Sequence, residues 1–258
     1  MTVLEGLPEL RQPLLSRART IAQPGFNRWL VPPAALAIHL CIGMAYGFSV
    51  FWLPLSRAIG ITDPVVCEGM GLVGALFSTA CDWRVADLGW IFTLFFVLLG
   101  CSAAIWGGWL ETAGPRKAGV VAALCWCGGM VISGFGVMTH QLWLMWLGSG
   151  FIGGIGLGLG YISPVSTLIK WFPDRRGLAT GMAIMGFGGG AMIGAPLADR
   201  LMNHFQSAEG VGVWQTFIDH GGDLSGLHAG RRLRLSRAAG RLEARGLAAQ
   251  GLGEDRPR

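Results

Sequence analysis

Long apolar segments separated by short polar stretches make up most of this 258-residue chain. Five segments are long enough to cross a membrane, which takes about 20 apolar residues in a helix. They are 29–55, 88–110, 118–138, 142–169 and 178–197, and none contains Asp, Glu, Lys or Arg. The pattern predicts an all-α, polytopic membrane bundle with about five transmembrane helices at 29–217, preceded by a polar leader at 1–28.

The composition supports a membrane protein and weakens a nucleic-acid interpretation. Charged residues are 14% of the chain, whereas soluble domains have about 25%. The net charge of +5 depends on residues 219–258, which hold eight of the 20 basic residues and five of the 15 acidic ones. The remaining 12 basic and 10 acidic residues give only +2, so we expect no nucleic-acid partner.

The loops between the apolar segments differ in positive charge. The leader has four Arg, the loop after the second segment has Arg116 and Lys117, and the loop after the fourth has Lys170, Arg175 and Arg176. The opposite loops hold fewer. Because Lys and Arg are enriched in cytoplasmic loops, we expect the N-terminus in the cytoplasm.

The six cysteines indicate no metal site. Cys67 and Cys81 flank a twelve-residue apolar stretch in the loop at 56–87, which is too short to span and favours an interfacial or re-entrant piece. In an oxidising compartment these two could form a disulfide, and two free thiols are the open alternative. Cys125 and Cys127 lie within the third segment without His or acid nearby, so we expect packing residues.

Glycines recur four residues apart in the fourth and fifth segments. This spacing lines one helix face and lets two membrane helices approach closely. The run at 154–160 mimics a dinucleotide loop, but no strand precedes it. We therefore expect helix packing at six positions: Gly150, Gly154, Gly158, Gly186, Gly190 and Gly194.

The loop between the second and third segments carries Gly107, Glu111, Gly114, Arg116 and Lys117. This spacing resembles the loop motif of the major facilitator superfamily, apart from a Thr where a basic residue is usual. An acid and basic residues at a helix end can form a pair that holds one conformation and breaks in another. An ordinary charged loop is the alternative interpretation.

A closer resemblance is to the oxalate/formate antiporter family within that superfamily. It covers 27–217 and rests on Asn-Arg-Trp at 27–29, Tyr161, Trp-Phe-Pro-Asp-Arg-Arg-Gly at 171–177 and Ala-Thr-Gly at 179–181. Gly190 to Pro196 also resembles the superfamily's exchanger motif, with Ala195 as a departure. The resemblance implies an integral protein of a bacterial inner membrane that exchanges small carboxylate anions by alternating access, without a cofactor.

The resemblance also implies a substrate cavity lined by aromatic residues. Tyr46, Tyr161 and Phe187 stand at the matching positions, and both tyrosines lie within apolar segments, where a phenol needs a partner or a wet cavity. Packing against lipid or helices is the alternative. His39 is the ionisable residue deep in the first segment, and we favour a hydrogen-bonded structural role over proton relay.

The chain changes character after Phe217, because 218–258 is rich in Arg, Gly, Leu and Ala without a steady period. Permitted codons for 220–247, read one base later, can encode an apolar helix. We therefore expect out-of-frame translation from about Asp219 onward, or else a disordered tail. Superfamily members have two six-helix halves, so we expect a missing C-terminal half or a complementing chain. A non-transporting membrane interaction protein is the alternative, and no nucleophile–base pair suggests an enzyme.

Overall fold

The computed structural model describes residues 25–66, 69–208, 210–219 and 221. Five helical spans are long and apolar enough to cross a membrane, which confirms the all-α bundle. The predicted leader, except for its last four residues, and nearly all of the predicted tail lie outside the described residues, as does Cys67.

The spans follow the predicted segments, with irregular turns in two of them. The first combines η2 (Arg28–Leu30), α1 (Val31–Ile42), η3 (Gly43–Phe51) and α2 (Trp52–Leu55). The second and third are α4 (Val85–Ala113) and α5 (Pro115–Met138). The fourth combines α6 (Leu142–Met145), η4 (Trp146–Gly153) and α7 (Gly154–Trp171), and the fifth combines η5 (Pro173–Arg175) and α8 (Arg176–Phe205).

Several helices extend past the apolar segments that predicted them. Helix α4 begins at Val85 rather than Leu88, and α8 ends at Phe205 rather than Leu197. Hydropathy marks the part of a helix suited to lipid, whereas backbone hydrogen bonds continue into the polar flanks. Residues 213–219 are also helical, and Phe217 from this segment is fully buried.

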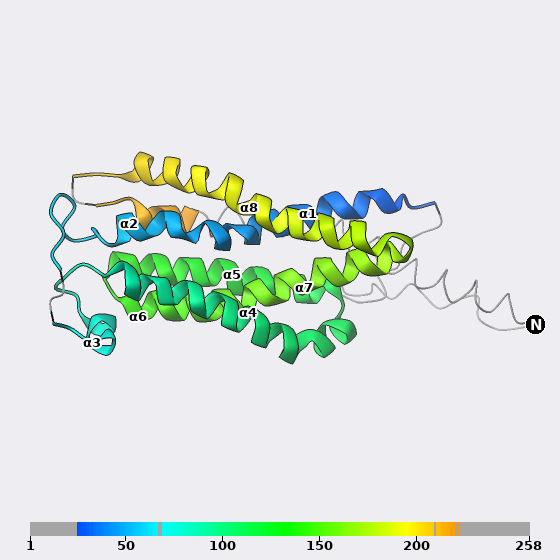
Figure 1. Cartoon of the computed structure of the whole chain (residues 1–258), viewed down its shortest axis with the longest axis horizontal. Helices are drawn as coiled ribbons and strands as arrows, with labels where there is room; N and C mark the ends of the chain where they lie inside the picture. The colour runs from blue at the N-terminus through cyan, green and yellow to red at the C-terminus, as the bar shows by residue number, and fades with distance from the viewer. Residues whose placement is uncertain (1–24, 67–68, 209, 220, 222–258) are drawn as a thin grey trace, which may run out of the picture.

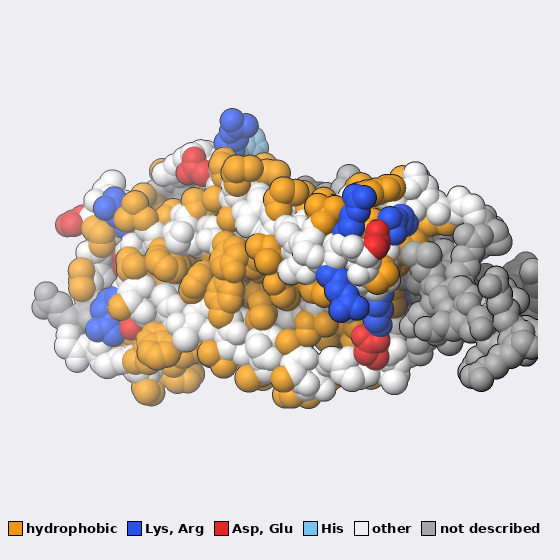
Figure 2. All heavy atoms as spheres, turned by 45° about the vertical axis from the view of Figure 1, so that its right-hand side comes forward, with side chains coloured by type: hydrophobic (Ala, Val, Ile, Leu, Met, Phe, Trp, Pro, Cys, Tyr) orange, Lys and Arg blue, Asp and Glu red, His pale blue; other side chains and the backbone are white. Residues whose placement is uncertain are grey.

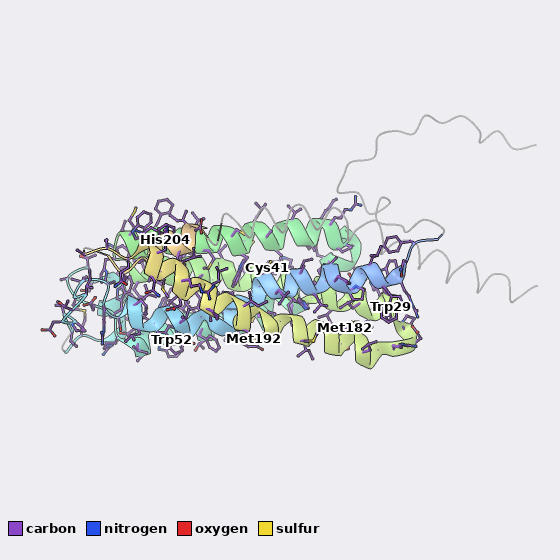
Figure 3. The ribbon with its side chains drawn as sticks, turned by 90° about the horizontal axis from the view of Figure 1, so that it is seen from above. Trp29, Cys41, Trp52, Met182, Met192 and His204 are labelled. Atoms are coloured by element: carbon purple, nitrogen blue, oxygen red, sulfur yellow. The ribbon has the colours of Figure 1, made fainter. Side chains whose placement is uncertain are left out.

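The first and fifth spans lie side by side and run in the same direction (Figures 1 and 3). In Figure 3, Trp29 and Met182 lie towards one end of the bundle, and Trp52 and His204 lie towards the other. Figure 2 shows hydrophobic side chains over the middle of one face, with a group of Lys, Arg and acidic side chains towards its right-hand end. This distribution fits a bundle embedded in lipid.

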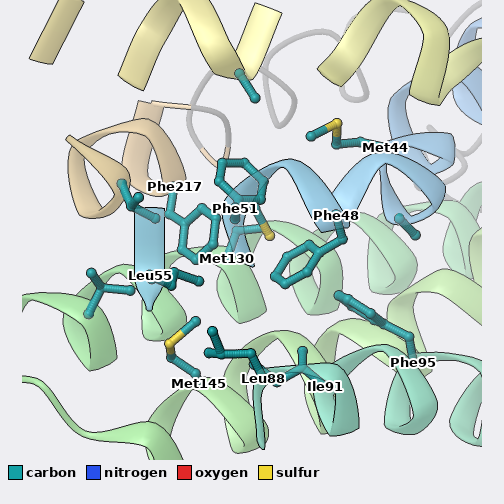
Figure 4. Close-up of a cluster of buried hydrophobic side chains, with 14 of the residues drawn as sticks. Met44, Phe48, Phe51, Leu55, Leu88, Ile91, Phe95, Met130, Met145 and Phe217 are labelled. Carbon is teal, nitrogen blue, oxygen red and sulfur yellow. The ribbon is translucent and has the colours of Figure 1, made fainter. Parts of the chain in front are cut away.

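The main hydrophobic core lies on one side of this pair of spans (Figure 4). Phe48 from η3 packs against Phe95 of α4, and Phe48 and Phe51 pack against each other and against Phe217. The ring centroids of these pairs are 4.7–5.8 Å apart. Aromatic pairs at such distances contribute roughly 0.5–1.5 kcal/mol each beyond their area burial. These contacts therefore stabilise the C-terminal end of η3 against the rest of the bundle.

The 56–84 loop folds over the end of the bundle through Asp82, a buried residue. Its carboxylate accepts backbone N–H bonds from Ile59, Gly60 and Val65 at 2.6–3.0 Å. Cys81 beside it is disulfide-bonded, so the thiol alternative for this residue was wrong. Its predicted partner is outside the described residues. Helix α3 (Leu72–Phe77) in this loop is short and largely exposed, as an interfacial segment would be.

His140 joins this loop to the end of α5. Its ring stacks on Trp83 with centroids 4.1 Å apart, and its Nε2–H donates to the Cys81 carbonyl at 2.9 Å. Burial lowers the pKa of the His140 imidazole, while the Cys81 carbonyl and the Asp82 charge oppose that shift. His140 also has a positive φ of 51°, which Asn tolerates well.

We predict that this histidine makes the bundle less stable at acidic pH. Below pH 6.5 the unfolded chain takes up a proton at His140 while the folded chain does not, so stability is lost as the pH falls through 6.5 towards the folded-state pKa. Thermal unfolding in detergent at pH 7.5 and 5.5 should therefore show a smaller drop in Tm for His140→Asn than for the unmodified chain. Equal drops in both proteins would contradict this.

Candidate functional site

The middle of the first span is a 3-10 helix, η3, rather than an α-helix. It runs for nine residues, although 3-10 runs beyond three or four residues are uncommon and often mark functional hinges. Residues three apart eclipse one another in this geometry, so Tyr46 lies directly above Gly43. A Cβ on Gly43 would overlap the Phe187 carbonyl and lie 3.0 Å from the Gly190 Cα.

Phe187 of α8 is the centre of an aromatic cluster that joins four elements. Its ring contacts Tyr46 of η3 at 4.8 Å and Tyr161 of α7 at 5.3 Å between centroids, both edge-to-face. It also meets His39 of α1 at 6.1 Å. The fold therefore brings together the three aromatic residues predicted as cavity residues. We call Tyr46, Tyr161 and Phe187 the aromatic wall.

The aromatic wall is covered on one side and open on the other. Phe187 is only 3% exposed, whereas Tyr46 is 50% exposed. The Tyr46 ring stacks on Phe96 of α4 at 5.4 Å, and Phe96 in turn contacts Phe92. The half-exposed Tyr46 therefore leaves the wall accessible along one flank of the bundle, near the middle of the first and fifth spans.

His39 lies behind the wall and is fully buried. Its Nδ1 is 2.8 Å from the Ala183 carbonyl of α8, and its Nε2 is 3.2 Å from the Tyr161 carbonyl of α7. Its ring also stacks on the Tyr161 ring at 5.3 Å. This single side chain thus links three of the five spans by polar contacts, in keeping with a hydrogen-bonded histidine.

The predicted packing glycines lie at two helix crossings. A Cβ on Gly150, Gly154 or Gly158 would meet atoms of α4, including Leu94, Leu98 and Leu99. A Cβ on Gly186, Gly190 or Gly194 would meet the first span, at Leu36, at Leu40 and Gly43, and at Met44 respectively. The first set thus faces the second span, and the second set fixes the distance between α8 and the aromatic residues of η3.

The loop motif is very short in the structure. Gly114 alone separates α4 from α5, with a φ of 83° that favours glycine. Glu111 forms an exposed ion pair with Lys170 of α7, rather than with a residue of its own loop. Arg116 is buried and Lys117 is exposed, while Gly107 lies within α4 with open space where a Cβ would be.

A second ion pair lies at the start of the first span. Arg28 donates two parallel bonds of 3.0 Å to the Asp174 carboxylate in the loop before α8. The Arg28 guanidinium also lies 5.0 Å from the Phe172 ring centroid. The motif at 171–177 therefore contacts the N-terminal end of the first span. The sequence of neither segment predicts this contact.

Sequence reasoning missed three residues that support the wall, namely Gly43, Gly47 and Phe96. Gly43 and Gly47 are four residues apart, and this spacing could have marked the first span as the partner of α8. Phe96 gave no such signal, because it stands in an unbroken apolar run. The described residues include no group of three His, Cys, Asp or Glu side chains suited to a metal ion.

The five apolar spans and the aromatic wall define an integral membrane helical bundle of the kind that forms transporters. The family model described as Major Facilitator Superfamily matches residues 35–218. The chain therefore belongs to the major facilitator superfamily.

Curated relatives resemble the chain at low identity. An uncharacterized MFS-type transporter, YhjX, from Escherichia coli (strain K12) is 26% identical over 194 residues, 74% of this chain and 40% of the relative. Apicoplast pyruvate carrier 1 from Toxoplasma gondii is 28% identical over 183 residues, 64% and 33% respectively. The oxalate:formate antiporter of Oxalobacter formigenes is 26% identical over 193 residues, 72% and 38%. The chain thus spans between a third and two fifths of these relatives.

We predict that Gly190→Ala destabilises the bundle and Gly188→Ala does not. A Cβ at 190 would overlap the Leu40 carbonyl and approach the Gly43 Cα to 2.7 Å, whereas nothing lies within 4 Å of one at 188. Overpacking costs about 1–3 kcal/mol, and Ala at an exposed helical Gly gains about 0.5–1 kcal/mol. Thermal unfolding in detergent checks this, and equal Tm changes in the two variants would refute it.

We also predict that Tyr46 reacts with tetranitromethane before Tyr161. The chain has only two tyrosines; Tyr46 is half exposed, while Tyr161 is partly buried against His39. Mass spectrometry of the nitrated peptides gives the order directly. Tyr46→Phe should remove the fast reaction and Tyr161→Phe should keep it. Faster nitration at Tyr161 would mean that the wall opens on the opposite side.

Proposed function

We propose that the chain forms one half of an alternating-access carrier that exchanges small carboxylate anions such as oxalate and formate. The observation that carries this proposal is the aromatic wall at the middle of the first and fifth spans. Superfamily transporters bind substrate near the midplane between two halves. The relatives include a pyruvate carrier and an oxalate:formate antiporter, and the cargoes in both names are small carboxylates.

In this proposal the wall holds a flat anion by shape and by weak polar contacts. Aromatic ring edges carry positive partial charge, and the hydroxyls of Tyr46 and Tyr161 can donate to carboxylate oxygens. Phe187 is buried between the two tyrosines and sets their spacing. The wall thereby limits the size of the anion and excludes water from one side of it.

The wall needs cationic partners from elsewhere, because a desolvated carboxylate is bound well only when its charge is neutralised. None of the five predicted segments contains Lys or Arg. We propose that a C-terminal half or a complementing chain supplies these groups and closes the open side of the wall at Tyr46. The lipid bilayer is the other partner of the bundle.

We further propose that the end carrying Arg28 and Glu111 faces the cytoplasm of a bacterial inner membrane. The excess of Lys and Arg in the leader and in the two loops on this side supports that orientation. Glu111 would then release Lys170 and pair with a residue of the other half as the carrier changes state. The other motif residues would form the turn between α4 and α5: Gly107, Gly114, Arg116 and Lys117. Breaking so exposed a pair costs little.

We predict that liposomes containing only this chain take up no more labelled oxalate or formate than empty liposomes. Adding a polypeptide encoded downstream in the gene should restore exchange. Tyr46→Phe and Tyr161→Phe should then each raise KM by about tenfold, the effect of losing one hydrogen bond to a charged group. Gly188→Ala is the matched control and should leave KM unchanged.

Two outcomes would contradict the proposal. Uptake by the chain alone would show that no second half is needed. A stable complex with the downstream polypeptide that exchanges no carboxylate would favour a membrane interaction protein that transports nothing.

A further inference from the structure

We propose that His39 is a proton-binding positioning residue, which takes up a proton when a carboxylate anion binds at the aromatic wall. The anion and the proton would then bind together. This inference rests on the proposed function and adds a coupling ion to it.

The hydrogen-bond geometry of His39 suits a protonated ring better than a neutral one. Both ring nitrogens face backbone carbonyl oxygens, at 2.8 Å for Ala183 and 3.2 Å for Tyr161. A carbonyl oxygen only accepts hydrogen bonds, and a neutral imidazole has one N–H to donate. In either tautomer one nitrogen lone pair therefore points at an oxygen lone pair. An imidazolium donates to both carbonyls, so the fold already provides the second acceptor.

Among the residues that the structure describes, none beside this ring gives it a countercharge. His39 is fully buried, and the residues of α8 packed against it, Ala183, Gly186 and Phe187, are uncharged. From α7 the titratable group that faces it is the Tyr161 phenol.

Charged residues on these helices lie far from the ring along each helix axis. The nearest on α8 is Arg176, seven residues before Ala183, which corresponds to about 10 Å of helix. On α7 it is Lys170 and on the first span it is Arg28, each further away along its helix. A charged imidazolium is therefore costly until an anion arrives.

A bound carboxylate would supply the missing charge. The His39 ring centroid is 5.3 Å from that of Tyr161 and 6.1 Å from that of Phe187, so an anion against these rings is separated from His39 by a single layer of side chains. Opposite charges at such a distance in a poorly solvated site attract substantially.

The coupling is reciprocal, so protonation tightens anion binding as much as the anion favours protonation. In the chemical step, a proton from bulk water forms one N–H bond at the ring nitrogen of His39 that was unprotonated. The same proton leaves to water when the anion is released on the other side.

The test uses the whole chain in complex with its downstream partner in lipid nanodiscs, with ¹⁵N-labelled histidine in the chain alone. The chain has five His, and replacing the other four leaves His39 as the sole signal without altering the site. Formate is the probe because it stays ionised near neutral pH, and chloride is the control anion. Formate at constant pH should move the His39 nitrogen shifts from the neutral to the imidazolium pattern, and chloride should not.

The affinity of the same complex for formate provides a second measurement. Calorimetry should give a Kd about tenfold lower at pH 6 than at pH 7.5, since a charge contact across one side-chain layer changes binding by about that factor. His39→Gln should bind formate with the same Kd at both pH values. His140→Asn is the matched control, since that histidine lies in the turn after α5, outside the wall, and it should keep the pH dependence.

The possible results separate the two proposals. A neutral His39 pattern at saturating formate, or a Kd that does not vary with pH, overturns the proton-binding role while carboxylate binding stands. No formate binding at any pH in the chain, with or without its downstream partner, overturns both. If His39→Gln does not fold, the nitrogen shifts of the single-histidine chain still decide the question.

Discussion

The close approach of Gly43 and Gly190 is the contact on which the site depends. A Cβ on Gly190 would lie 2.7 Å from the Gly43 Cα, and one on Gly43 would overlap the Phe187 carbonyl. The hydrophobic effect does not drive helices together within lipid, so close van der Waals packing through small residues holds them together instead. With a larger residue at either position, α8 would stand further off and Phe187 would not reach both tyrosines.

The 3-10 geometry of η3 places Tyr46 on the same side of the first span as the Gly43 contact. Residues three apart eclipse in a 3-10 helix, whereas in an α-helix they are offset by roughly 60°. Tyr46 therefore shares the face of Gly43 that meets α8, and its ring reaches Phe187 at 4.8 Å. Phe48 and Phe51, which are also three residues apart, share another face and pack into the core. The 3-10 geometry of η3 thus directs Tyr46 and the two phenylalanines to different faces of the first span.

The sequence predicted the spans well because apolar length alone identifies a membrane helix. It predicted the face of each helix less well, since lipid-facing and core-facing residues are equally apolar in a membrane. Glycine spacing was the exception, because close packing needs small residues whatever the solvent. Phe96 and the partner of Glu111 could not be predicted, because Lys170 is 59 residues away in sequence and an exposed pair leaves no pattern.

The distribution of charge separates the contacts that hold the bundle together from those that can break. Arg28–Asp174 joins the first span to the loop before the fifth, and Glu111–Lys170 joins the second span to the fourth. Exposed pairs of this kind contribute about 0–1 kcal/mol each, so they cannot hold the bundle together. The glycine crossings of α8 with the first span and of α7 with α4 keep it rigid instead. In the carrier proposed above, the bundle would therefore rock as one body, and its exposed ion pairs would exchange partners at each step.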